Sequence, residues 1–273
     1  RQKARIVVMA CNGIGTPRLL LNSRSGPFPD GLANNSGLVG KNLMFHPYSM
    51  VMGVFDEQLE SYKGPLGCSI ISSEFYETDL NRGFVRGYAF QVLRSSGPAI
   101  TAQGFVTTSP VPWGSDHHRV FDERFGKTIT VAVIGEDLPE SHNSVSLDPT
   151  LTDNDGIPAP AVAYSMSDNS LKMMDHGIAR ATEVLQAAGA TEVLVNPLLR
   201  SAGWHLLGTA RMGTEIGNSV VDGYGRSHEV KNLFIIDGSI FVTAGAVNPT
   251  STIQALALYI ADYFKQNARH LLD

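Results

Sequence analysis

Two residues near the carboxyl end of the chain have side chains suited to handling a proton and an oxygen atom. His205 lies in the stretch from Trp204 to Gly213, just ahead of a Gly-Thr turn. Arg211, in the same stretch, is expected to be a cation that is buried or lines the site. Asn248 comes directly before Pro249, and an apolar helical pattern starts behind that proline. A neutral imidazole is the side chain best matched to removing a hydroxyl proton near neutral pH. We therefore expect His205 and Asn248 to meet across one substrate site.

This pair of side chains is suited to the oxidation of an alcohol. His205 would take the hydroxyl proton, and the amide of Asn248 would hold the same oxygen so that the carbon–hydrogen bond points at an acceptor. Because no protein side chain accepts hydride, a redox cofactor must do so. The structural alternatives are a core histidine for His205 and a helix cap for Asn248, and the cap is compatible with a role in the site.

Residues that could contact the cofactor lie at the ends of predicted elements. Asp237 and Gly238 end a buried apolar strand, where α/β folds place ligands, so Asp237 could accept a bond from a ribityl or ribose hydroxyl while Gly238 allows close approach. Pro249 and Thr250 open the last helix, whose free amides could face the anionic edge of a reduced flavin. Asn12, in a Gly-rich turn, completes the predicted contacts. For Asp237, the alternative is an ordinary turn residue.

Two other kinds of site are disfavoured by spacing. Gly13-Ile14-Gly15 could begin a dinucleotide fingerprint, but Arg18 stands at the third glycine position and no acidic residue ends a second strand about 20 residues on, which argues against NAD. The pair His117-His118 lacks a third ligand at a defined spacing, so we predict no metal site. His46 is predicted to be structural, with a position facing the flavin as the alternative.

Composition limits the partners and the compartment. The 273 residues carry a net charge of −5 with no basic patch, so nucleic acid is not an expected partner. No apolar run approaches the ~20 residues of a membrane helix. Cys11 and Cys68 have neither metal nor redox spacing, which fits a reducing compartment and slightly favours the cytoplasm. Cys11 is expected to be packed, and His142 and His176 to be surface residues.

The hydrophobic pattern predicts α/β elements at the two ends of the chain and an antiparallel sheet between them. A helix is expected after Asp168-Asn169-Ser170, with Leu171, Met174 and Leu185 facing inward. The predicted strands are Ile6 to Ala10, Ser49 to Phe55, Gly83 to Leu93, Thr128 to Ile134, Glu192 to Asn196 and Leu233 to Gly238, with a hairpin over 144–164. Helices opened by Pro17 and Pro249 follow the first and last of these strands.

The predicted fold class is therefore α/β plus α+β. Residues 1–45 and 214–273 would form part of a doubly wound domain that binds the flavin. Residues 46–213 would form an inserted substrate-binding domain with an antiparallel sheet. The two ends of the chain should come together in space.

At these residues the chain resembles the glucose–methanol–choline (GMC) family of flavin oxidoreductases. The matching signatures are His205-x-x-Gly208-Thr209-x-Arg211-Met212-Gly213, then Asn232-Leu233-Phe234 leading to Asp237-Gly238-Ser239, and Asn248-Pro249-Thr250. The resemblance covers most of the chain, and in its Arg-Met-Gly form is similar to bacterial sugar and glycoside oxidising, pyranose-oxidase-like members. It implies that His205 is the catalytic base, Asn248 the second site residue and FAD the cofactor.

The chain departs from that family in one respect, because it has no GxGxxG segment to hold the ADP part of FAD. We expect an amino-terminal FAD-binding segment or chain to supply it; otherwise the isolated chain would bind FAD poorly and be inactive. The expected function is FAD-dependent oxidation of an alcohol group of a sugar, glycoside or related polyol, by an oxidase or a dehydrogenase. The alternatives are a flavin-containing lyase of the same fold and a non-catalytic fragment or interaction subunit.

Overall fold

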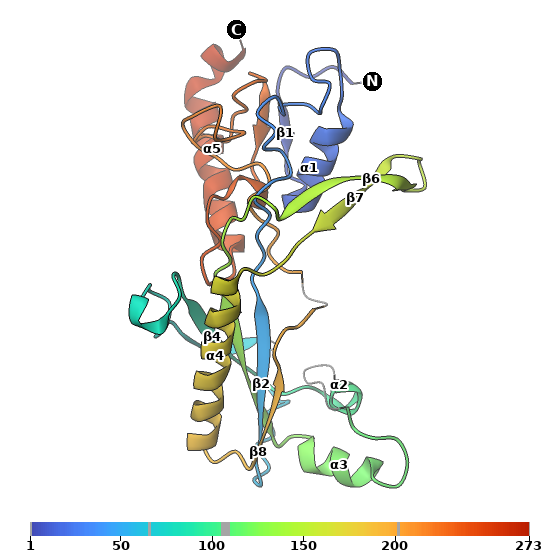
Figure 1. Ribbon diagram of the computed structural model, residues 1–273, viewed down its shortest axis with the longest axis vertical. Coiled ribbons are helices and arrows are strands. Elements are labelled where there is room, and N and C mark those ends of the chain that lie inside the picture. Colours follow the sequence, from blue (N-terminus) through green and yellow to red (C-terminus); the bar gives the residue numbers. More distant parts are fainter. Residues whose placement is uncertain (1, 65–66, 105–109, 201–202, 273) are drawn as a thin grey trace. The chain divides into compact units, whose positions relative to one another are not determined.

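The computed structural model describes residues 2–64, 67–104, 110–200 and 203–272. The chain divides into two compact units (Figure 1). The first unit comprises Arg1–Phe45, Asp137–Ser165 and Gly203–Asp273, and the second comprises His46–Glu136 and Met166–Ala202. Both ends of the chain thus belong to the first unit.

The first unit is built on a short parallel strand pair. Strand β1 (Val7–Met9) pairs with β9 (Leu233–Ile235) in the register Val7↔Leu233 and Met9↔Ile235. Helix α1 (Asn12–Asn22) follows β1, the 3-10 turn η2 (Gly238–Ile240) follows β9, and α5 (Thr250–Leu272) closes the chain. Leu20 of α1, Phe234 of β9 and Ile260 of α5 belong to one buried core, so both helices pack with the strand pair around the same core (Figure 1).

A hairpin belongs to the same unit. Strands β6 (Ser144–Thr152) and β7 (Pro158–Ala163) are antiparallel, as predicted. Arg18 of α1 donates from Nε to the carbonyl of Pro158 at 2.8 Å and forms an ion pair of 2.8 Å with Asp153. These contacts attach residues 137–165 to the first unit. Backbone hydrogen bonds attach residues 207–213 to the same unit. The sequence-based boundary had assigned both segments to the antiparallel-sheet domain.

The second unit contains a five-stranded antiparallel sheet in the order β3-β4-β5-β2-β8. The strands are β2 (Tyr48–Val54), β3 (Cys68–Ser72), β4 (Tyr88–Leu93), β5 (Thr128–Gly135) and β8 (Glu192–Asn196). The predicted strand over 83–93 is shorter, because the 3-10 turn η1 (Leu80–Arg82) and a loop precede Tyr88. Two short helices, α2 (Pro98–Gln103) and α3 (His117–Arg124), lie between β4 and β5 along the chain.

Helix α4 (Asp168–Ala187) covers one face of this sheet. Its cap is Ser167, whose hydroxyl accepts from the amide of Ser170 at 3.1 Å, rather than the predicted Asp168-Asn169-Ser170. A Cβ on Gly177 would approach Cγ1 of Val133 to 2.5 Å, so the glycine lets the helix lie close to the strand. Met174 and Leu185 face inward as predicted, whereas Leu171 is 48% exposed, because the buried stripe runs through Ser170 and Met173 instead.

Three smaller expectations were wrong. Pro17 lies inside α1 instead of opening it. His176 is half-buried against the rings of Phe75 and Phe84 and lies 2.8 Å from the hydroxyl of Tyr88, so it is no simple surface residue. Cys11 is exposed, and both cysteines are free thiols. In the described part of the chain, no helix is both long and apolar enough to cross a membrane.

Candidate active site

His205 and Asn248 lie together in the first unit, although 43 positions separate them in the sequence. The amide nitrogen Nδ2 of Asn248 is 3.3 Å from Nε2 of His205. Because an amide nitrogen can only donate, this orientation assigns Nε2 as the acceptor and the ring proton to Nδ1. Burial lowers the pKa of His205 below its ordinary value, which favours the neutral form. The arrangement therefore presents a neutral imidazole beside an amide.

The backbone of His205 has an uncommon conformation, with φ at +62°. Left-handed backbone is disfavoured for a residue with a Cβ and persists where surrounding contacts determine it. The histidine loop, which we define as residues 203–209, is enclosed by such contacts. A Cβ added to Gly13 or to Gly238 would lie 2.5 or 2.8 Å from the carbonyl oxygen of Leu206. Both glycines are thus required by close approach of the protein's own backbone.

The other side of the histidine loop pairs with the segment before the second unit. Met44 and Leu207 exchange backbone hydrogen bonds of 3.0 and 3.1 Å. Gly208 has φ at +91°, and a Cβ there would lie 2.2 Å from the carbonyl oxygen of Asn42. The glycine of the Gly-Thr turn is therefore explained by packing of the loop on this segment.

Asp237 is 7% exposed and is satisfied by protein donors. Its Oδ2 accepts from the backbone amide of Cys11 at 2.8 Å and from the hydroxyl of Thr16 at 2.5 Å, and its Oδ1 accepts from the amide of Ser239 at 2.8 Å. The carboxylate thus joins the turn after β1 to the turn after β9. A second lone pair on Oδ1 is the remaining capacity for a ligand hydroxyl.

The other predicted cofactor contacts lie at two helix starts. Asn12 has φ at +64°, and its Oδ1 accepts from the amides of Ile14 and Gly15 at 2.9 and 3.1 Å, so its side chain caps α1. Thr250 is the first residue of α5, and the carbonyl of Pro249 accepts from the amide of Ile253 at 2.9 Å. Pro249 is therefore the cap residue itself, and Asn248 precedes it by one position.

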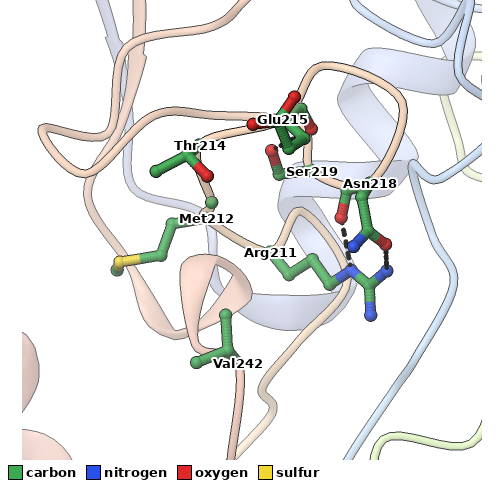
Figure 2. Close-up of a pocket in the computed structure, with 8 residues that line it drawn as sticks. Arg211, Met212, Thr214, Glu215, Asn218, Ser219 and Val242 are labelled. Atoms are coloured by element: carbon green, nitrogen blue, oxygen red, sulfur yellow. Dashed lines mark hydrogen bonds between the residues drawn. The ribbon is translucent and has the colours of Figure 1, made fainter.

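Arg211 holds a loop rather than an acidic side chain. Figure 2 shows its guanidinium bonded twice to Asn218: Nε donates to the backbone carbonyl at 2.9 Å, and one Nη donates to the side-chain oxygen. The half-buried arginine lines an open pocket of about 230 Å³, whose lining includes Met212, Thr214 and Val242. The two hydrogen bonds from Arg211 to Asn218 fix the loop that follows the Arg-Met-Gly sequence.

Two polar residues of this region were missed by the sequence analysis. Thr16 bonds Asp237, and the hydroxyl of Thr209 donates to the carbonyl of Gly13 at 2.7 Å. Thr209 was recognised only as part of a motif. The signal that could have identified its role is Pro17, because a proline inside a helix leaves the carbonyl four residues earlier without its usual donor.

Comparisons with known proteins identify similar chains. Residues 139–257 match the family model described as GMC oxidoreductase. The chain is 46% identical to 2-methyl-1,2-propanediol dehydrogenase of Mycolicibacterium austroafricanum over 99% of its own length and 49% of that protein. It is 31% identical to paromamine 6'-oxidase of Streptomyces fradiae, with 94% of this chain and 45% of that protein covered. For the fructose dehydrogenase large subunit of Gluconobacter japonicus, the identity is 30%, over 96% and 47%.

Solved structures show the same fold. Pyridoxine 4-oxidase from Mesorbium loti superposes with a TM-score of 0.63 at 14% identity, over 96% of this chain and 51% of that one. A formate oxidase of Aspergillus oryzae, studied for FAD modification, gives a TM-score of 0.61 at 20% identity, over 97% and 54%. The chain thus spans about half the length of the relatives it matches. Residues 139–257 thus match the carboxy-terminal family model of the GMC oxidoreductases, and the chain is similar to members of that family along nearly its whole length.

Proposed function

We propose that this chain carries the catalytic part of an FAD-dependent oxidoreductase that acts on an alcohol group of a sugar, glycoside or related polyol. The observation that carries the proposal is the 3.3 Å approach of Asn248 to Nε2 of a neutral, partly buried His205. The relatives named as a diol dehydrogenase, a paromamine oxidase and a fructose dehydrogenase support the substrate class.

The two side chains divide the work on the alcohol. When an alcohol binds, its hydroxyl would take the place of the Asn248 amide at Nε2 of His205, which accepts the hydroxyl proton. The amide of Asn248 would then donate to the same oxygen and hold it as charge develops. Bound flavin supplies the acceptor for the hydride that leaves the carbon. With a flavin bound as hydride acceptor, His205 would take the one proton that the alcohol gives up, and a carbonyl compound would remain. The low pKa of His205 keeps the base unprotonated at neutral pH.

The residues around β9 fit a flavin. The hydroxyl of Ser239 is buried and has no hydrogen-bond partner among the described residues, so a bound ligand or water could satisfy it. Asp237, next to it, retains one acceptor position on Oδ1. The amide end of α5 begins at Thr250, two positions after Asn248, and favours negative charge in front of it. These features support FAD contacts by Asp237 and residues 248–250, and a contact by Asn12 through its remaining amide donors. Gly238, by contrast, is explained by its packing on Leu206.

The surface of the first unit supports an amino-terminal partner segment carrying GxGxxG. Parallel sheets are normally buried on both faces, yet β1 and β9 form a sheet of two strands among the described residues. Val7 and Val8 of β1 are 46% and 48% exposed, and Leu258 of α5 is 72% exposed. Further strands from the partner segment would complete a doubly wound FAD-binding domain here. The antiparallel-sheet unit is proposed to bind the substrate.

Anaerobic mixing with substrate tests the proposal. The complete, yellow protein is mixed without oxygen with a vicinal diol or a sugar, and flavin absorbance is followed. Bleaching at a rate that saturates with substrate is the expected result. A lyase would convert substrate while the flavin stays oxidised, and a non-catalytic subunit would carry no flavin, so either result overturns the oxidoreductase assignment.

A further inference from the structure

The histidine loop is supported by Phe45 as well as by Met44. The backbone of Gly203 lies against the Phe45 ring, since a Cβ added there would meet a ring carbon at 3.6 Å. Met44 binds Leu207 through the two backbone hydrogen bonds already described. The backbone is therefore supported on both sides of His205 by two adjacent residues.

Phe45 is in turn held by a buried carboxylate. Asp137 is 1% exposed, and its Oδ2 accepts from the hydroxyl of Tyr164 at 2.8 Å and, more weakly, from the backbone amide of Phe45 at 3.4 Å. The rings of Phe45 and Tyr164 meet edge to face, with centroids 4.8 Å apart. Burial, followed by the charge of Asp137, raises the pKa of Tyr164, so its hydroxyl remains a donor at neutral pH.

A left-handed residue needs such support more than an ordinary one does. At φ +62°, His205 is in a sparsely populated region that relaxes unless neighbouring contacts prevent it. Gly13 and Gly238 limit the loop where Leu206 lies, and Phe45 limits it at Gly203. The contact with Phe45 comes immediately before the catalytic position and depends on a separate set of side chains.

We propose that Asp137 and Tyr164 are positioning residues for His205. By holding Phe45, they keep the histidine loop in the backbone conformation that brings Nε2 within reach of Asn248. The role of His205 in this inference rests on the proposed function, whereas the support of the loop rests on geometry alone. The two parts can therefore be tested separately.

Four variants of the complete, flavin-loaded protein test the catalytic part. Asp137→Asn removes the charge, and Tyr164→Phe removes the hydroxyl but keeps the ring. Tyr88→Phe is the matched control, because it also loses a 2.8 Å hydroxyl contact, to His176 in the other unit. We expect kcat to fall about tenfold to a hundredfold in the first two variants, with KM and flavin content unchanged. The control should keep its kcat, and the double variant Asp137→Asn/Tyr164→Phe should fall less than the product of the single effects.

Amide hydrogen exchange tests the geometric part without any need for activity. The amide of Leu207 should exchange about tenfold faster or more in Tyr164→Phe, while amides of β2 and β5 keep their rates. Unchanged exchange at Leu207 in this variant overturns the inference, as does an equal loss of kcat in Tyr88→Phe. If Asp137→Asn does not fold, Tyr164→Phe alone decides. Faster exchange in a protein that no alcohol reduces would refute the proposed function and leave the positioning role standing.

Discussion

The hydroxyl of Thr209 donates a 2.7 Å hydrogen bond to the carbonyl of Gly13, in the first turn of α1. In a regular helix, the amide four residues later would bond that carbonyl, but here the later residue is Pro17, which has no amide proton. Thr209 thus replaces the missing donor. The same bond fastens the histidine loop to α1, so a local defect of one element becomes the attachment point of another.

Replacing Thr209 by Val keeps the side-chain shape and leaves the buried carbonyl of Gly13 without a donor. Thr209→Val should therefore lower the free energy of unfolding by about 1–3 kcal/mol. Pro17→Ala restores an amide proton, so Thr209→Val should be less damaging in the Pro17→Ala background. Urea unfolding of the four proteins forms a double-mutant cycle. Strict additivity would show that the amide at position 17 and the hydroxyl do not share this acceptor.

Most of the fold could be predicted from local pattern. Glu192–Asn196 has the predicted bounds, and β1, β2, β5 and β9 lie at or near theirs, because runs of β-branched and apolar residues favour strands. Leu171 was placed on the wrong side of α4, since the buried stripe is set by which residues the sheet accepts. His176 was misjudged for a similar reason, as its neighbours Phe75 and Phe84 lie far away in the sequence.

Only the two catalytic candidates of the site could be predicted, and not the contacts that hold them. The residue types of His205 and Asn248 and the motifs around them indicated that the two side chains meet, and the structure brings them together. Nothing local indicated that Gly238 packs on Leu206, or that Asp237 bonds Cys11 and Thr16. The contacts of Asp237 with Cys11 and Thr16 join segments more than 200 positions apart in the sequence. They depend on how the turns after β1 and β9 face each other.

His205→Ala should reduce kcat by about a hundredfold or more while flavin stays bound, because general-base catalysis is lost but the cofactor contacts remain. Stopped-flow flavin reduction measures it, with the flavin spectrum as the control for binding. Turnover equal to that of the unaltered protein would remove His205 from its proposed role.

The pH dependence of kcat/KM should also report on His205. Burial lowers its pKa, so the base stays neutral below the ordinary value of 6.5 and activity should begin to fall only at more acidic pH. The acid limb should disappear in His205→Ala, whose residual activity lacks this titrating base. An acid limb centred above 6.5 in the unaltered protein would contradict the assignment.

Asp237→Ala should weaken flavin retention. The variant removes the carboxylate that joins the turn after β1 to the turn after β9 and the proposed acceptor for a flavin hydroxyl. Equilibrium dialysis against flavin-free buffer measures retention. Asp222→Ala is the control, because it also removes an acidic turn residue of the same unit, whose Oδ1 caps the turn before β9. Normal retention in Asp237→Ala would remove it from the cofactor site.

The second unit should lose stability in acid through His176. Burial, followed by the charges of Arg180 and Arg82, lowers the pKa of His176 below its unfolded value of 6.5. The unfolded chain therefore takes up the proton first, so this contribution is fully present above pH 6.5 and is lost as the pH falls through that value toward the folded pKa. His176→Gln cannot titrate and should flatten the decline of the melting temperature between pH 7 and about pH 5. His142→Gln, at an exposed position, should leave the decline unchanged, and an identical decline in His176→Gln would show that another group causes it.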